Sequence, residues 1–359
     1  MVAVAGRVGA QHAAPLPRAQ MDKIAFFDLE GPLSPQDNAL EVMGLVANGR
    51  QAFAVISRYD DLLALEGVED YEPGDTLKLI LPFLILHGLT AEDIRSVSRK
   101  APLTAGAREL AATLVKAGWR VHIISTSYQQ HALRVAAELG IPDRDVACTR
   151  LEPADLASRL KGSDLDLAKE AWDYIQQTSE GLSLEEIATG AIDEKIRTRL
   201  DEFYWQVLPR TELGSALRGV EVVGGRRKVR ALESFCRAAG SYLGQVAVVG
   251  DSITDFQMLK AVEAAGGVAI VFNGNRYALP FGTVGVASVS LMNLLPVLQV
   301  WLDQGREALR KAVLSSSLGP LEGEATYQWL VNSPNLEGVA RIHATARKNA
   351  RGQGAGSLG

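Results

Sequence analysis

The chain has 359 residues, of which 47% are hydrophobic and 22% charged, so it can build a large core and more than one domain. Its 42 acidic and 37 basic residues give a net charge of −5, which argues against a nucleic-acid partner because no large positive field is available. The only cysteines, Cys148 and Cys236, are too few for a disulfide framework and indicate a reducing compartment, so we expect a cytoplasmic protein.

Neither the amino terminus nor the longest apolar stretch predicts insertion into a membrane. Residues 1–20 are rich in Ala, Gly, Pro and Arg but lack the continuous apolar run of a signal peptide. We expect them to form a disordered extension, with Met21 as a candidate start. The stretch 77–89 contains Lys78 and Pro82 and is too short and too polar to span a bilayer.

Continuous apolar runs predict buried parallel strands at 24–27, 121–124, 246–249 and 268–272. Helical segments such as 105–116 separate these runs, an alternation that is typical of an α/β fold. We therefore predict a doubly wound parallel sheet. In such sheets, ligands bind at the carboxyl ends of the strands.

Two long segments interrupt the alternation of strands and helices. Residues 34–102 carry helical periodicity and predict a helical cap. Residues 152–219 also show helical spacing and predict a second helical insertion, whose role the sequence does not indicate. The remaining segments are an α/β core over 21–33, 103–151 and 220–314, a carboxyl-terminal extension over 315–346, and a Gly/Ser-rich tail over 347–359 that we expect to be disordered.

Polar residues cluster at or near the ends of the predicted strands. In chain order they are Asp28 and Glu30, Ser125 and Thr126, Lys228, and Asp251 and Asp255. Carboxylates after two different strands, with a hydroxyl and a lysine, supply a nucleophile, a metal site and neutralisation of phosphate charge. Each cluster also has an ordinary structural explanation, such as a helix cap at Ser125 or a solvated basic turn at Lys228. The combination of all of them favours phosphoryl transfer through an aspartate.

These clusters resemble, in order, the motifs of the haloacid dehalogenase superfamily of phosphatases. The strings 26–33, 121–128 and 248–255 carry the resemblance, together with Lys228. The resemblance implies a haloacid dehalogenase-like α/β core that works with Mg²⁺. It implies that Asp28 is the nucleophile, and that Glu30 is the general acid and base and binds Mg²⁺ through its main-chain carbonyl.

The later motifs imply the remaining roles. Ser125 and the amide of Thr126 would bind phosphoryl oxygens, and Lys228 would neutralise the phosphoryl group and orient the nucleophile. Asp251 would bind Mg²⁺ directly, while Asp255 would hold a metal-bound water or the lysine.

Some positions distinguish the chain within that superfamily. Glu30 stands where most members have Asp, although members with Glu exist, including enolase-phosphatases. Thr254 stands where phosphoserine-phosphatase-like members commonly have Asn, a departure that points away from phosphoserine as the substrate. The short strings 28–32 and 125–128 look most like the R subunit of archaeal energy-converting hydrogenase A and its free-standing relatives.

The sequence thus predicts a Mg²⁺-dependent phosphatase that hydrolyses a small phosphate monoester through an aspartyl-phosphate. Arg50 and Arg58 of the predicted cap are candidates for recognising the rest of the substrate, although charged cap residues are more often solvated. One alternative is a noncatalytic or regulatory subunit of a hydrogenase-type complex, and a protein complex or homodimer is compatible with either reading. The other is a dehalogenase, which would not need the metal-binding Asp251 and Asp255.

Overall fold

The core of the computed structural model, which describes residues 22–190 and 193–351, is a seven-stranded sheet of order β3-β2-β1-β4-β5-β6-β7. Strands β1 to β6 pair in parallel, and β7 pairs antiparallel with β6. The strands are β1 (Ile24–Phe27), β2 (Arg120–Tyr128), β3 (Val146–Thr149), β4 (Ala247–Gly250), β5 (Val268–Phe272), β6 (Val284–Ser288) and β7 (Ala325–Trp329). The predicted doubly wound α/β fold is confirmed.

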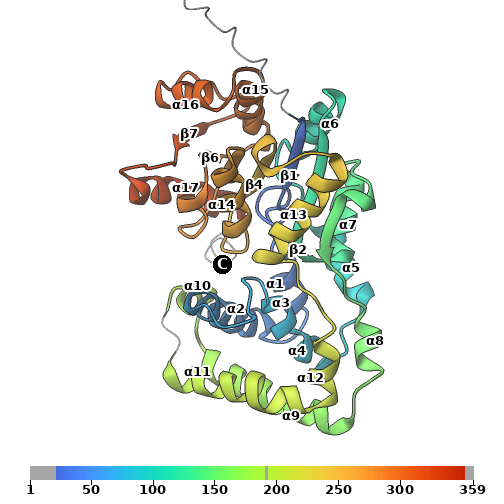
Figure 1. Cartoon of the computed structure of the whole chain (residues 1–359). Helices are drawn as coiled ribbons and strands as arrows, with labels where there is room; N and C mark the ends of the chain where they lie inside the picture. Colours follow the sequence, from blue (N-terminus) through green and yellow to red (C-terminus); the bar gives the residue numbers. More distant parts are fainter. Residues whose placement is uncertain (1–21, 191–192, 352–359) are drawn as a thin grey trace, which may run out of the picture.

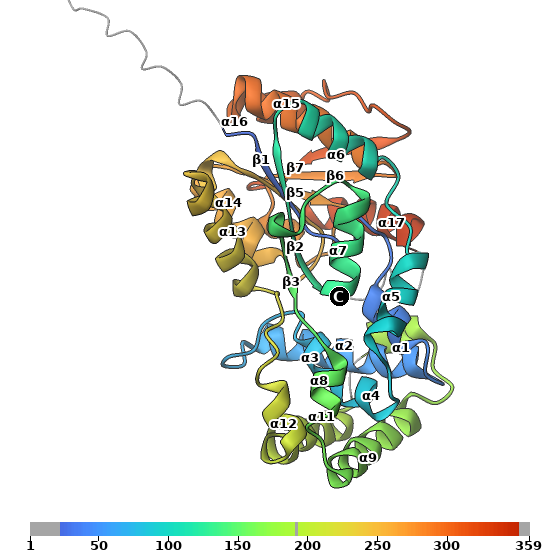
Figure 2. The same ribbon diagram turned by 90° about the vertical axis from the view of Figure 1, so that its right-hand side faces the viewer.

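Helices cover both faces of this sheet, which explains why its central strands are apolar throughout. Side chains of β1 alternate between two hydrophobic clusters: Phe27 belongs to the one with α6, α7, α15 and α16, and Phe26 to the one with α13, α14 and α17 (Figures 1 and 2). These helices are α6 (Ala107–Lys116), α7 (Gln129–Glu138), α13 (Arg226–Ala239), α14 (Phe256–Ala265), α15 (Leu295–Gln304), α16 (Arg306–Leu314) and α17 (Leu336–Arg351). Cys148 and Cys236 are free thiols buried in these clusters.

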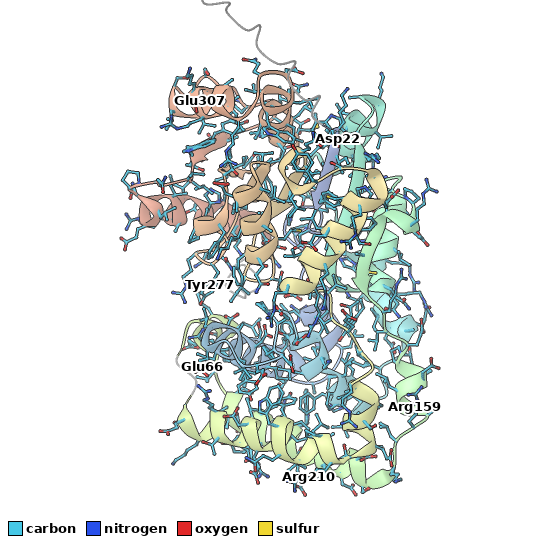
Figure 3. The ribbon with its side chains drawn as sticks, viewed as in Figure 1. Asp22, Glu66, Arg159, Arg210, Tyr277 and Glu307 are labelled. Carbon is cyan, nitrogen blue, oxygen red and sulfur yellow. The ribbon has the colours of Figure 1, made fainter. Side chains whose placement is uncertain are left out.

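The segments predicted as cap and insertion form one helical layer at the end of the core toward which the strands run (Figure 1). Figure 3 shows Asp22 at the opposite end of the core, so β1 runs toward the helical layer. The first segment contains α1 (Asn38–Met43), α2 (Gly49–Glu66), α3 (Thr76–Leu79), α4 (Leu81–Leu86) and α5 (Ala91–Lys100). The second contains α8 (Pro153–Ala157), α9 (Gly162–Ser179), α10 (Leu184–Thr189), α11 (Glu194–Asp201) and α12 (Glu212–Leu217).

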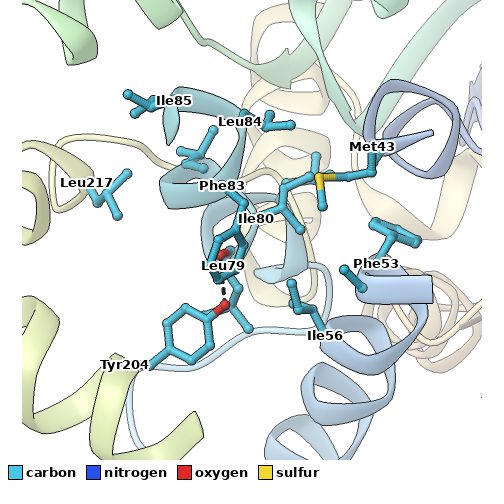
Figure 4. Packing of buried hydrophobic residues seen from close by; sticks show 14 of the residues in the cluster. Met43, Phe53, Ile56, Leu79, Ile80, Phe83, Leu84, Ile85, Tyr204 and Leu217 are labelled. Atoms are coloured by element: carbon cyan, nitrogen blue, oxygen red, sulfur yellow. Dashed lines mark hydrogen bonds between the residues drawn. The ribbon is translucent and has the colours of Figure 1, made fainter. Parts of the chain in front are cut away.

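The two segments share a single hydrophobic cluster, so the insertion completes the core of the cap. The ring of Phe83 in α4 lies 5.5 Å from that of Trp172 in α9, centroid to centroid. The hydroxyl of Tyr204 donates a hydrogen bond of 2.9 Å to the carbonyl of Leu79 (Figure 4). The role that the sequence left open for residues 152–219 is therefore at least partly structural.

Short helical turns join the longer elements. They are η1 (Asp143–Asp145), η2 (Glu202–Val207), η3 (Leu208–Arg210), η4 (Leu243–Gln245), η5 (Leu279–Phe281) and η6 (Leu291–Leu294). Within the part of the chain that the structure describes, no helix combines the length and the apolarity that a membrane crossing requires.

The start of the predicted disordered tail differs from the expectation. We expected a disordered tail from Arg347, but α17 continues through Arg351, and buried residues of this last part face the core. Earlier in α17, His343 binds the helix to the loop after β5: its Nδ1 accepts a hydrogen bond of 3.0 Å from the amide of Gly274. The rest of the expected tail, and the expected extension over 1–20 with Met21, lie outside the described residues.

Candidate active site

Asp28 and Asp251 meet at the point where the strand order of the sheet reverses. Asp28 directly follows β1 and Asp251 directly follows β4, and these two strands are parallel neighbours. The amide of Asp28 extends the pairing by donating a hydrogen bond of 2.8 Å to the carbonyl of Val249. Chain segments leave the sheet in opposite directions on either side of this point, so a crevice forms there.

Lys228 links the two motifs that the sequence separates most widely. Its Nζ donates hydrogen bonds of 2.7 Å to Oδ1 of Asp28 and 2.7 Å to Oδ1 of Asp255, and its side chain is fully buried. These carboxylates hold the lysine charged by raising its pKa despite burial. Burial and the charge of Asp255 raise the pKa of Asp28 to about 7, and the ammonium of Lys228 opposes that rise.

The loop after β1 passes directly over Asp251. Gly31 has a φ of +109°, and a Cβ there would lie 2.4 Å from the carboxyl carbon of Asp251, so no larger residue fits. Glu30 accepts hydrogen bonds at Oε1 from the amide of Asn38, at 3.1 Å, and from the hydroxyl of Ser127. Burial, with a further contribution from the charge of Asp37, raises the pKa of Glu30 to about 8.

The acidic residues provide a donor set that fits Mg²⁺. One carboxylate oxygen from each of Asp28, Asp251 and Asp255 lies within 4.8 Å of the others. Both oxygens of Asp255 already accept hydrogen bonds, Oδ1 from Lys228 and Oδ2 from the amides of Asp251 and Ser252. In contrast, Oδ1 of Asp251 is buried and has no hydrogen-bond partner among the described residues, an arrangement that is costly unless a cation binds there. Asp28 and Asp251 therefore fit as direct ligands, and Asp255 fits as their support.

The end of β2 contributes three neighbouring hydroxyls with different surroundings. The buried Oγ of Ser125 accepts a hydrogen bond of 3.1 Å from the amide of Ser127. Thr126 lines the cavity described below, and its buried Oγ1 has no partner among the residues that the structure describes. Ser127, which the sequence analysis did not single out, donates to Glu30.

A cavity of about 90 Å³ lies between the core and the helical layer. From the core it is lined by Asp28, Glu30, Thr126 and the loop after β4. From the helical layer it is lined mainly by α2 and the segment 74–77. Its polar lining is acidic or hydroxylic apart from two arginines.

The structure does not place Arg50 or Arg58 in this cavity. Arg50 pairs with Glu41, and the Nε of Arg58 donates a hydrogen bond of 3.1 Å to the carbonyl of Gly190. The arginines that line the cavity are Arg347 and Arg351, which both donate to Oδ2 of Asp251. The sequence shows their spacing of one helical turn but gives no sign that α17 reaches the loop after β4.

Comparisons with known proteins agree with this architecture. No protein-family model matches the chain. A curated protein named phosphoserine phosphatase, from Archaeoglobus fulgidus, is 28% identical over 141 residues, which are 39% of this chain and 38% of that protein. The match thus spans well under half of that relative.

A solved structure of a gene product from Archaeoglobus fulgidus is similar over almost the whole chain. The two share 30% sequence identity with a TM-score of 0.79, and the alignment covers 95% of this chain and 99% of the other. The chain therefore belongs to the same family as this Archaeoglobus fulgidus gene product, and its sheet has the doubly wound α/β arrangement that the sequence predicts.

Proposed function

We propose that this protein is a Mg²⁺-dependent phosphatase that hydrolyses a small phosphorylated metabolite. The observation that carries the proposal is the buried group in which Lys228 bridges Asp28 and Asp255 beside the unpartnered oxygen of Asp251. The partial match to a phosphoserine phosphatase supports the same reaction class. The free, buried cysteines support a reducing, cytoplasmic setting.

In the proposed reaction, a carboxylate oxygen of Asp28 attacks phosphorus, and the bond from phosphorus to the ester oxygen breaks. Glu30 gives its proton to the departing alcohol, and its raised pKa of about 8 keeps it protonated near neutral pH. Glu30 then takes a proton from water as the water attacks the aspartyl-phosphate and releases inorganic phosphate. Lys228 holds Asp28 in position and offsets negative charge in both steps.

Asp28 and Asp251 would hold the Mg²⁺ ion. When bound, it would neutralise the phosphoryl oxygens and lower the pKa of Asp28, so that the nucleophile is ionised. The helical layer would exclude bulk water from the cavity.

The alternative, a noncatalytic subunit, is less well supported by the geometry. Lys228 is buried between the carboxylates of Asp28 and Asp255. Burying these charged groups costs desolvation free energy, a cost that well-packed apolar residues at the same positions would avoid. A scaffold gains nothing from retaining this arrangement, whereas a phosphoryl-transfer site requires it.

The test is the release of phosphate from an aryl phosphate and from a panel of phosphorylated metabolites, with Mg²⁺ and with EDTA. We expect turnover only with the metal, and Asp28→Asn should lower it by at least about 1,000-fold while leaving the circular dichroism spectrum unchanged. Asp303→Asn, at an exposed position of α15, is the matched control and should keep full activity. Turnover by Asp28→Asn equal to that of the unaltered protein would overturn the proposal, as would the absence of turnover with every ester.

A further inference from the structure

The last turn of α17 brings two arginines into the candidate active site. Both lie on the same face of the helix, and both donate to Oδ2 of Asp251, Arg351 at 3.1 Å. Their side chains are only 4% and 7% exposed, so they are part of the site and not of the protein surface. Burial of guanidinium groups at this depth is costly and demands several polar partners.

The arginines do not occupy the oxygen that fits the metal. They contact Oδ2 of Asp251, whereas Oδ1 of the same carboxylate has no partner within the described ranges 22–190 and 193–351. One carboxylate can therefore serve the metal on one side and the arginines on the other. Oδ1 is thus open to a metal while α17 is in place.

Arg351 has donor capacity that Asp251 does not use. A guanidinium carries several N–H donors in a planar fork, and the Nε of Arg351 is buried with no partner among the described residues. Thr126 lines the same cavity and also presents a buried hydroxyl without a partner there. Unsatisfied buried donors at a cavity indicate that a ligand supplies the acceptors.

The charges around the cavity restrict where a negative group can bind. Among the described residues, Arg347 and Arg351 are the cationic side chains that line it, while α2 contributes Asp60 and Asp61. Asp61 already pairs with Arg58 of the same helix, at 3.7 Å. Asp60 already accepts hydrogen bonds from the hydroxyl of Tyr71 and the amide of Thr76. The positive charge that can hold an anion in this cavity therefore comes from α17.

We propose that Arg347 and Arg351 form a subsite for a second anionic group of the substrate, a carboxylate or a second phosphate. Both groups match the planar fork of a guanidinium. The enzyme would then favour phosphate esters whose alcohol carries a negative charge near the ester oxygen. This inference rests on the proposed phosphatase activity and specifies its substrate class.

The test compares three esters of similar size: 2-hydroxyethyl phosphate, which has a neutral alcohol, phosphoglycolate, which adds a carboxylate, and ethanediol bisphosphate, which adds a phosphate. The measured quantity is the ratio of kcat/KM for each doubly anionic ester to that for the neutral one. Arg351→Gln should lower this ratio by about 10- to 100-fold, the loss of one charge-assisted contact. The ester whose ratio falls more identifies the second group as carboxylate or phosphate.

Controls separate the subsite from a structural role. Arg341→Gln removes an exposed arginine from the same helix and should leave the ratio unchanged. Arg351→Lys keeps the charge without the fork and should restore part of the ratio. If Arg351→Gln lowers kcat/KM equally for all three esters, or tightens Mg²⁺ binding in calorimetry without altering the ratio, the arginines act only on Asp251 and the inference is wrong. An unaltered protein that hydrolyses none of the esters would count against the proposed function itself.

Discussion

At the scale of single residues, the site depends on contacts that tolerate no additional atoms. The loop after β1 approaches the carboxylate of Asp251 so closely that a Cβ at Gly31 would overlap it. The same backbone has a positive φ, which an L side chain rarely adopts. Both the backbone conformation and the contact with Asp251 therefore require glycine at position 31.

Gly31→Ala should abolish most of the proposed phosphatase activity, because Asp251 must move away from the proposed metal site to accommodate the methyl group. Gly88→Ala is the matched control: Gly88 also has a positive φ, of 66°, but a Cβ there would meet no atom within 4 Å. The control should lose only about 1 kcal/mol of unfolding free energy and keep its kcat/KM. Kinetics with urea unfolding of both variants would check this, and equal activity in the two would contradict the steric argument.

The residues of the site divide into those that sequence reasoning finds and those that it misses. Asp28 and Asp251 follow from local signals, since each comes directly after a predicted strand. Lys228 became a candidate only through its combination with the other motifs, because alone it is typical of a solvated basic turn. Arg347 and Arg351 do not, because their contact with Asp251 depends on how α17 packs against the core. A Gly-rich stretch directly after Arg351 also made the last helical turn look like a disordered tail.

At the scale of elements, ion pairs join the helical layer to the helix that carries Lys228. Glu72 pairs with Arg226, and Asp75 pairs with Arg227, at the first turn of α13. Gly74 lies between these acidic residues, and a Cβ there would meet Thr126 at 2.7 Å. The segment 72–76 thus fixes the position of the cap relative to the site.

Arg227→Ala should destabilise the protein by about 2 to 4 kcal/mol, because it leaves the buried carboxylate of Asp75 without its cation. Arg230→Ala, on the same helix, removes a pair with Glu221 in which both side chains are about two-thirds exposed, and should cost under about 1 kcal/mol. Urea unfolding measures both values. If both variants lose a similar amount of unfolding free energy, the ion pair between Arg227 and Asp75 contributes no more stability than the exposed pair of Arg230 with Glu221.

The sequence predicted four of the strands, β1, β2, β4 and β5, but missed the buried strand β6 and the edge strands β3 and β7. Strands β1, β4 and β5 are buried along their whole length, so their sequences are continuous apolar runs. Strand β7 lies at the edge and is mostly half-buried, so Ala325–Trp329 carries no such run. The packing of the insertion against the cap was also hidden, because helical periodicity shows which residues are buried but not which element covers them.

At the scale of the whole molecule, buried ionisable groups act on stability in opposite directions as the pH falls. Burial raises the pKa of Asp60 to about 7, so the folded state binds this proton more readily than the unfolded chain and gains stability as the pH falls. Burial lowers the pKa of His343 from 6.5 to about 4, so the folded state resists this proton and loses stability over the same range. The total pH dependence therefore cannot be assigned to either group without a variant.

The contribution of His343 can be isolated by comparing the protein with His343→Gln. Its neutral ring accepts a hydrogen bond from the amide of Gly274 at Nδ1 and lies 3.0 Å from the Oε1 of Gln328 at Nε2, so protonation would break the first contact. Well above pH 6.5 the ring is neutral in both folded and unfolded chains and exerts no pH dependence. Between pH 6.5 and pH 4, the unaltered protein should lose roughly 3 kcal/mol of unfolding free energy relative to His343→Gln.

Urea unfolding of both proteins at several pH values, without metal, measures this difference directly. His87→Gln replaces an exposed histidine and should follow the curve of the unaltered protein much more closely. A difference between the unaltered protein and His343→Gln that stays constant down to pH 4 would mean that His343 protonates freely in the folded state. The end of α17 would then not be anchored by a neutral ring, and the position of Arg347 and Arg351 at Asp251 would need another cause.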